Sequence, residues 1–365
     1  MAADPPSREA ILAALDRIID PKTGKGLAAA GLAQGLIVRE GRVTFMLEVA
    51  SEDAALYAPV REAAERALRN LPGVVRAQVV MTAAARGRAG ESRVRKGAKV
   101  SPDPQGQPKA SEAEKPPHVH RVIAIASGKG GVGKSTVAVN LACAFTAAGL
   151  RVGLLDADVY GPSAPRMMGV DEQPEFEDGK LTPLLAHGVK VMSIGFLVDE
   201  GAPMIWRGPM ASSAVRQMIA DVRWADEAGP LDVLVVDLPP GTGDIQLTLV
   251  QKLKIDGVVI VSTPQEIALI DARRAAAMFR KTETPILGVI ENMAFFADPT
   301  TGAPIFIFGE GGARAEAARL GVPLLAVVPI DIALRQGGDE GRPIVVADPE
   351  SPTAQAFRAA ARALA

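Results

Sequence analysis

The stretch that decides the fold is VIAIASGKGGVGKST, residues 122–136. It begins with an apolar run typical of a buried strand, passes through a glycine-rich loop, and leads into an apolar-rich helix that we expect to reach residue 148. The loop fits G-x-x-x-x-G-K-[ST] in the strand–loop–helix context that this pattern requires. Its glycines let backbone N–H groups converge on phosphate oxygens at the positive end of the helix, so the stretch predicts a nucleotide-phosphate site.

Each position of this loop has an expected task in such a site. Lys134 is expected to reach the β- and γ-phosphates, and the Ser135 hydroxyl to bind Mg²⁺. The residues expected to contact the nucleotide are Gly128, Lys129, Gly130, Gly131, Val132, Gly133, Lys134, Ser135 and Thr136.

Around this loop, short apolar runs alternate with helical stretches. The predicted strands are 122–126, 152–156, 189–194, 233–237, 258–262, 286–290 and 324–328. They are continuously apolar, as strands are when helices cover both faces of a parallel sheet. We therefore expect residues 119–365 to form an α/β domain with a doubly wound, mostly parallel sheet.

The residues before this domain divide into two parts. Residues 1–86 predict a small α+β domain, with helices at 8–19 and 59–70 and strands at 32–38, 42–49 and 74–82. Residues 87–118 contain five prolines and almost no large apolar residue. Such a segment cannot bury enough surface to offset its ordering entropy, so we expect a flexible linker.

Carboxylates end two of the predicted strands, at the edge where open α/β sheets bind ligands. Asp237 follows the run 233–236, as a Walker-B aspartate does, and is expected to hold Mg²⁺ directly or through water. The loop after it, 238–244, is suited to sensing a γ-phosphate. Asp156 and Asp158 end the second strand, and their alternate spacing suggests that only one faces the phosphates. A role in capping the next element stays open for both.

Composition excludes several classes of protein. The 365 residues carry a net charge of −2, which gives no reason to expect nucleic acid or an anionic membrane as a partner. The single cysteine, Cys143, excludes an internal disulfide and a cysteine-only metal site within one chain. The apolar runs are too short to span a bilayer, and the first residues lack the pattern of a signal peptide. We expect a soluble, cytoplasmic protein.

The second lysine of the loop, Lys129 in KGGVGKS, resembles the deviant phosphate loop of MinD-type ATPases. The resemblance implies ATP as the nucleotide and a homodimer that forms when ATP binds. It also implies that Lys129 reaches across to the partner's nucleotide, and that Asp158 positions or activates the attacking water. By this resemblance the catalytic residues are Lys129, Lys134, Asp158 and Asp237.

Further motifs narrow the resemblance. DADVYGPSAPRMMG (156–169), WRGPM (206–210), DLPPGTGD (237–244) and ENM (291–293) resemble the Mrp/ApbC family of iron–sulfur cluster carrier ATPases. Residues 1–86 are similar to the small iron–sulfur assembly domain that bacterial members often carry. The resemblance implies a slow, Mg²⁺-dependent ATPase that delivers clusters to client apo-proteins. It also implies that Asn292 contacts adenine, with a strand-end turn as the alternative.

The chain departs from this family at the cluster site. Family members carry C-P-x-C-G after E-N-M, whereas here Asp298 and Thr301 stand where the two cysteines would be. Iron prefers thiolate in such clusters, so this pair is a poor substitute. Cys143 is predicted to be a buried core thiol, and Tyr57 occupies the region where relatives of the small domain often place a Cys-Pro pair.

Three other functions were compared with the carrier. A MinD/ParA-like positioning ATPase needs a basic face or tail, but residues 119–365 carry 22 basic and 28 acidic side chains, net −6. A reductase like the nitrogenase iron protein needs two cysteines per chain and is excluded. A cluster-free, ATP-gated scaffold in the same pathway stays open because of Asp298 and Thr301. The run at Trp206 and Arg207 fits either an interface or core packing.

Overall fold

The computed structural model describes residues 6–39, 42–50, 53–84, 113, 115–159, 161–177, 179–197, 214 and 217–365. The chain divides into two compact units, Met1–Ser111 and Glu112–Ala365. Most of the predicted linker, together with Trp206 and Arg207, lies outside the described residues.

The first unit is a three-stranded sheet with two helices. Its elements are α1 (Arg8–Leu15), β1 (Ala33–Arg39), β2 (Arg42–Ala50), α2 (Ala54–Arg69) and β3 (Arg76–Ala84). β1 and β2 pair antiparallel, and β2 and β3 pair parallel. Alternate residues of β2, Val43, Phe45 and Leu47, are buried with residues of both helices in one core. Alternation along β2 gives the sheet one apolar face for the helices to cover.

Helix α2 begins earlier than the sequence predicts. Pro59 was expected at its start, where proline is favoured, but it lies inside the helix, which begins at Ala54. Pro59 lies in the second turn of α2 and removes one backbone N–H donor, so the helix loses a single hydrogen bond and continues.

The second unit is built on an eight-stranded sheet in the order β15-β12-β11-β4-β10-β5-β9-β8. Its strands are β4 (Val119–Ser127), β5 (Val152–Asp156), β8 (Leu184–Ala186), β9 (Val189–Ser193), β10 (Leu231–Asp237), β11 (Gly257–Ser262), β12 (Ile286–Glu291) and β15 (Leu324–Val327). Neighbouring strands run parallel except β8, which pairs antiparallel with β9 at the edge. All seven predicted strands are present, and the predicted doubly wound α/β fold is confirmed.

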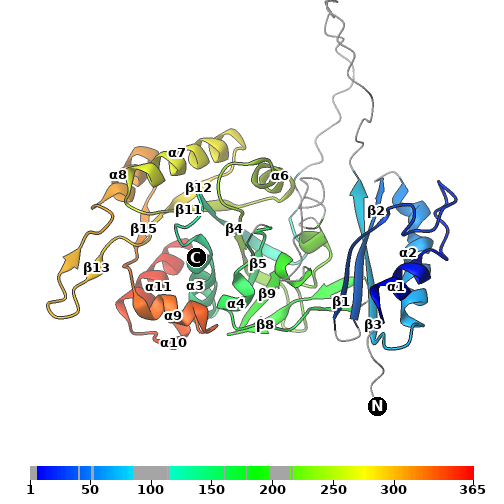
Figure 1. The fold of residues 1–365 in the computed structure, drawn as a ribbon. Coiled ribbons are helices and arrows are strands. Elements are labelled where there is room, and N and C mark those ends of the chain that lie inside the picture. The colour runs from blue at the N-terminus through cyan, green and yellow to red at the C-terminus, as the bar shows by residue number, and fades with distance from the viewer. Residues whose placement is uncertain are drawn as a thin grey trace, which may run out of the picture. The chain divides into compact units, whose positions relative to one another are not determined.

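Helices cover both faces of this sheet (Figure 1). They are α3 (Lys134–Ala147), α4 (Ala164–Met167), α6 (Asp244–Lys252), α7 (Glu266–Lys281), α8 (Gly312–Leu320), α9 (Ile332–Asp339), α10 (Ile344–Ala347) and α11 (Pro352–Leu364), with a 3₁₀ turn, η2 (Ile194–Leu197). Figure 1 shows α7 and α8 along one face, with α3 and α11 on the other. Two short hairpins, β6 (Glu175–Glu177) with β7 (Lys180–Thr182) and β13 (Phe296–Ala297) with β14 (Pro304–Ile305), complete the unit.

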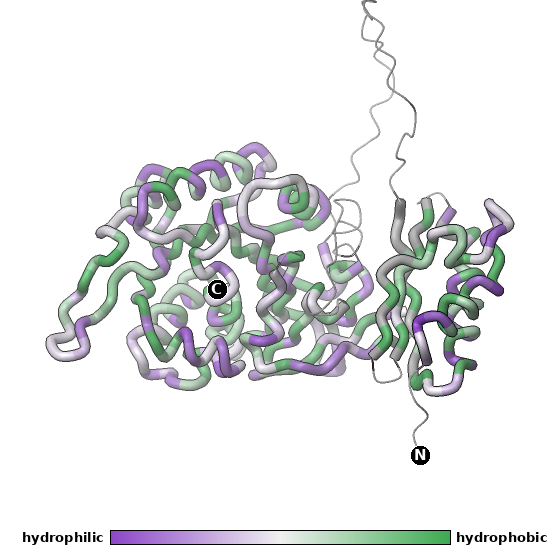
Figure 2. Tube along the Cα trace, in the orientation of Figure 1, coloured by the Kyte–Doolittle hydropathy of each residue, from purple (hydrophilic) through white to green (hydrophobic). Residues whose placement is uncertain are grey.

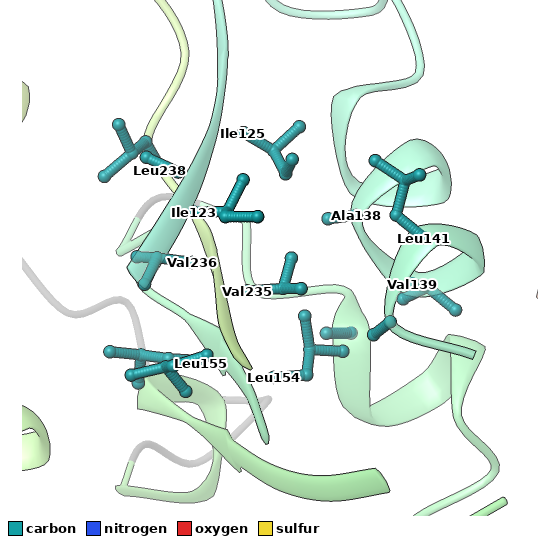
Figure 3. Close-up of a cluster of buried hydrophobic side chains, with 14 of the residues drawn as sticks. Ile123, Ile125, Ala138, Val139, Leu141, Leu154, Leu155, Val235, Val236 and Leu238 are labelled. Atoms are coloured by element: carbon teal, nitrogen blue, oxygen red, sulfur yellow. The ribbon is translucent and has the colours of Figure 1, made fainter. Parts of the chain in front are cut away.

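The core holds the nucleotide-binding edge of the sheet in place. Figure 3 shows Ile123, Val235 and Leu154 of the central strands between the sheet and α3, while Val236 and Leu155 point to the opposite side. Residues Val137 to Phe145 of α3 are buried throughout. The interior of the second unit is accordingly mostly hydrophobic in Figure 2, and hydrophilic residues lie on its outer helices and turns. None of the described helices is long and apolar enough to cross a bilayer.

Candidate nucleotide site

The loop between β4 and α3 depends on glycine at three positions. Gly131 and Gly133 adopt left-handed backbone conformations, with φ of 78° and 80°. At Gly128, an added Cβ would lie 2.0 Å from the carbonyl carbon of Asp271 in α7, so no larger residue fits. These glycines let the loop turn sharply beneath α7 and leave its N–H groups at the start of α3.

Lys134 lies between two carboxylates from neighbouring strands. Its Nζ is 2.5 Å from Asp237 Oδ1 at the end of β10, and 3.7 Å from Asp158 Oδ2 in the loop after β5. The same Nζ is 3.3 Å from the Ser135 hydroxyl. The four residues come together because β4, β5 and β10 are parallel neighbours, so their carboxyl ends meet at one edge.

Asp156 and Asp158 have different surroundings, although they are two residues apart. Asp156 is fully buried, and its carboxylate accepts hydrogen bonds from the N–H groups of Asp158 (3.1 Å), Ser163 (3.0 Å) and Ala164 (3.0 Å). It also accepts one from the Ser193 hydroxyl at 3.2 Å. Asp156 therefore caps α4 and holds the loop that carries Asp158, whereas Asp158 faces the lysine.

Two buried carboxylates at this edge favour a cation. Burial, and then the charge of Asp237, raise the pKa of Asp156 to about 7. Burial also raises the pKa of Asp237 above its ordinary value, although Lys134 opposes this rise. Because burial penalises the charged form of both groups, positive charge bound beside them lowers that penalty.

The residues at this edge fit a magnesium ion. Asp237 Oδ2 is buried without a hydrogen-bond partner among the described residues, and the Ser135 hydroxyl lies beside Lys134, which pairs with Asp237. Both are oxygen ligands, which Mg²⁺ prefers. Within the described residues, no group of three or more His, Cys, Asp or Glu is arranged to hold a metal. This is expected for Mg²⁺, which is held by one or two protein oxygens together with phosphates and water.

Lys129 differs from Lys134 in having no ion pair with the described residues. Its side chain is partly exposed, and no hydrogen bond or ion pair joins its ammonium group to the described residues. The structure thus presents a second loop lysine whose charge is not used within this part of the chain.

Asn292, directly after β12, contacts the phosphate loop and holds its backbone. Its side-chain amide donates a hydrogen bond to the carbonyl oxygen of Val132 at 2.8 Å, and its own N–H donates to Ser262. An added Cβ on Gly133 would lie 2.1 Å from this amide nitrogen. Asn292 therefore contacts the phosphate loop itself, and its contact with adenine stays a prediction. The sequence did not reveal this support, because Asn292 and Val132 are 160 residues apart.

The positions of the family's cysteines lie in the turn between β13 and β14. Asp298 Oδ1 accepts hydrogen bonds from the N–H groups of Thr300 (2.9 Å) and Thr301 (2.8 Å), which lower the pKa of Asp298. Gly302 completes the turn with φ of 72°. Asp298 is thus a half-buried, turn-forming carboxylate, and Thr301 beside it is exposed.

The described residues offer no thiolate to replace these cysteines. Cys143 is 2% exposed in α3, and burial raises its pKa to about 12, so it stays protonated as a core thiol. In the first unit, the buried Tyr57 donates its hydroxyl hydrogen bond to the carboxylate of Asp20. Asp20 also accepts from the N–H groups of Lys22 and Thr23.

This fold and loop define a P-loop NTPase with the MinD-like arrangement of strands. The chain belongs to the family described as NUBPL iron-transfer P-loop NTPase, which matches residues 118–365. Residues 8–79 match a second family, described as iron-sulfur cluster assembly protein. These matches confirm the resemblance drawn from the motifs.

Similar proteins include carriers that match the chain over nearly its whole length. The iron-sulfur cluster carrier protein of Synechocystis is 42% identical over 98% of this chain and 96% of its own. The carrier protein of Deinococcus radiodurans is also 42% identical, over 98% and 94%. The Arabidopsis thaliana iron-sulfur protein required for NADH dehydrogenase is 51% identical over 66% of this chain and 76% of its own.

Solved structures resemble the second unit. A nucleotide-binding protein in complex with ADP from Archaeoglobus fulgidus is 40% identical, with a TM-score of 0.57, over 66% of this chain and 92% of its own. The cell division ATPase MinD of Pyrococcus furiosus is 25% identical, with a TM-score of 0.50, over 67% and 98%.

Proposed function

We propose that the protein is an ATP-binding and ATP-hydrolysing carrier of iron–sulfur clusters, which dimerises with ATP and delivers clusters to client apo-proteins. The observation that carries this proposal is the Lys134 ammonium, buried between Asp237 and Asp158 at the end of a phosphate loop. The whole-chain relatives named as cluster carriers support the cargo.

In this proposal each residue of the site has a separate task. The loop N–H groups and Lys134 bind the phosphates, and Lys134 exchanges its contact with Asp237 for one with the nucleotide. Ser135 and Asp237 would hold Mg²⁺, which neutralises phosphate charge when bound. Asp158, held by Asp156, orients the attacking water. A single carboxylate carried on a loop is a weak catalytic base, so hydrolysis is slow without a partner.

Substitution of Lys129 tests whether this lysine contacts the partner's nucleotide in the proposed ATP-bound dimer. Lys129→Ala is expected to keep nucleotide binding by the single chain but to weaken the ATP-dependent dimer at least about tenfold, because a charge-assisted contact across the interface is lost. Light scattering with and without ATP measures the dimer, and a nucleotide titration checks binding. Lys281→Ala, an exposed lysine of α7, is the matched control. Undiminished dimers in Lys129→Ala would contradict the contact across the interface.

Asp156 gives a test of the loop that carries Asp158. Asp156→Asn is expected to lower the free energy of unfolding by about 1–3 kcal/mol, because its NH₂ group would face backbone N–H donors. ATP turnover should fall as well, since Asp158 is no longer held. Urea unfolding and steady-state turnover measure the two effects. Asp158→Asn is the control and should lose turnover with a smaller change in stability. An Asp156→Asn variant as stable as the wild type would show that these hydrogen bonds do not hold the loop.

The residues at the positions of the family's cluster-binding cysteines, Asp298 and Thr301, are not thiols, so the proposal needs another source of cluster ligands. We infer that the carrier completes the cluster's ligands with thiols from a client, a partner protein or glutathione, because Asp298 forms a turn and Cys143 is buried. The same observation favours one second candidate, an ATP-gated scaffold of the pathway that holds no cluster. A positioning ATPase is less supported, because Phe357 of α11 is buried in the core of the second unit.

A further inference from the structure

One buried side chain beside the site has no hydrogen-bond partner among the described residues. Gln246 lies in the first turn of α6 and is 1% exposed, yet neither its Oε1 nor its Nε2 has a hydrogen-bond partner. Among the described residues with buried, unpaired side-chain atoms, Gln246 has both a donor and an acceptor unpaired. A buried amide in this condition is costly, and native proteins retain one where another state of the molecule pairs it.

The place of Gln246 in its helix suggests the missing partner. Helix α6 begins at Asp244 after Gly243, an N-cap residue that has no side chain to cap the helix. Gln246 is the third helical residue, and glutamine or glutamate there can reach back to the N–H of the N-cap residue. The described structure does not contain this hydrogen bond. The natural partner of Gln246 Oε1 is therefore the N–H of Gly243.

The loop that ends at Gly243 begins in the nucleotide site. It follows Asp237, whose Oδ2 is also buried and unpaired. Gly241 N–H donates to the carbonyl oxygen of Ser127, the residue before the phosphate loop, at 3.0 Å. Gly241 has φ of 89°, and an added Cβ on Gly243 would meet nothing within 4 Å. The loop is thus attached to the phosphate loop at Gly241, whereas the Cα of Gly243, at the start of α6, faces open space.

We propose that Gln246 is a positioning residue that fixes the loop 238–243 when ATP binds, by accepting a hydrogen bond from the N–H of Gly243. This inference rests on the proposed ATPase function. In the described position the loop leaves Gln246 unpaired, and with Mg-ATP the loop shifts so that the helix start is capped. The energy regained at Gln246 then favours the ATP-bound position of the loop over the empty one.

Three variants test this proposal. Gln246→Met removes the polar atoms at similar length, Gln246→Glu keeps an acceptor that can cap, and Gln251→Met changes an exposed glutamine of the same helix. Gln246→Met should lower kcat for ATP about tenfold with KM within about twofold, because the loop is misplaced during turnover. Its unfolding temperature without nucleotide should rise, since an unpaired amide is removed. Gln246→Glu should keep kcat within about threefold of the wild type, and Gln251→Met should match the wild type.

Rescue by glutamate separates capping from packing, because a packing role would favour methionine over a buried carboxyl group. Equal losses of kcat in Gln246→Glu and Gln246→Met, wild-type kcat in Gln246→Met, or a lower unfolding temperature for Gln246→Met would each overturn the proposal. If the wild type hydrolyses no ATP, the proposed function fails instead. Amide hydrogen exchange tests the role of Gln246 independently of ATP turnover. ATP should slow exchange in the peptide 241–246 of the wild type but not in that of Gln246→Met. Equal exchange in the two proteins would overturn the role of Gln246.

Discussion

Lys134→Ala is expected to reduce ATP turnover at least about 100-fold, the usual loss when one preorganised charged donor is removed from a reacting group. The buried Nζ lies 2.5 Å from Asp237, at the start of α3 where the phosphates would bind. Removing it takes away the charge-assisted phosphate contact and leaves two buried carboxylates without their cation. Steady-state turnover at saturating Mg-ATP measures the effect.

A folding control is needed, because the same substitution breaks a buried ion pair. Circular dichroism and the unfolding temperature should show a folded second unit. Lys180→Ala, which removes a half-exposed pair with Asp221, should leave turnover unchanged. Turnover of a folded Lys134→Ala protein within about threefold of the wild type would mean that the phosphate site lies elsewhere.

Restoring the missing ligands is expected to have the second large effect. The double variant Asp298→Cys with Thr301→Cys should raise the iron retained after anaerobic reconstitution from below one to about four per dimer, because four thiolates then meet at a bridging cluster. The turn should survive the loss of the Asp298 carboxylate. Gly302 keeps its φ of 72°, and the backbone hydrogen bond from Asp298 N–H to Ala303 stays at 2.9 Å.

The control places the two cysteines two residues further along the chain. Thr300→Cys with Ala303→Cys adds two exposed thiols to the same turn, with the same spacing but not at the positions of the family's cysteines. Iron retained equally by both double variants would indicate adventitious binding. Iron no higher in Asp298→Cys with Thr301→Cys than in the wild type would show that this turn does not face a cluster site.

The sequence predicted the elements that local pattern controls. The phosphate loop combines a strand, glycines and a helix within fifteen residues, so its context was visible before the structure. The parallel strands were visible because burial on both faces makes them continuously apolar. The short edge strand β8 and the hairpin β13–β14 were not predicted, since two or three half-exposed residues leave no such pattern.

Contacts in the site between residues far apart in the sequence could not be predicted from the sequence. Spacing indicated that one of Asp156 and Asp158 faces the phosphates, and the resemblance named Asp158. The hydrogen bond from Ser193, 37 residues from Asp156, was not visible in the local pattern. Asn292, directly after β12, supports Val132 of the phosphate loop, 160 residues away in the sequence. The unpaired amide of Gln246 depends on what surrounds α6 in three dimensions. Such contacts join segments that only the fold brings together.

The central claim is that this protein carries clusters without a pair of thiol ligands of its own. The amount of iron that the wild-type protein binds tests this claim most directly. After anaerobic reconstitution with iron and sulfide, followed by gel filtration, we expect fewer than about one iron per dimer without added thiol, and more when glutathione is present, because the missing thiolates come from outside the chain. About four irons per dimer without added thiol, with a stable charge-transfer band unchanged in Cys143→Ala, would contradict the account. Oxygen ligands or other groups of the chain would then suffice to hold the cluster.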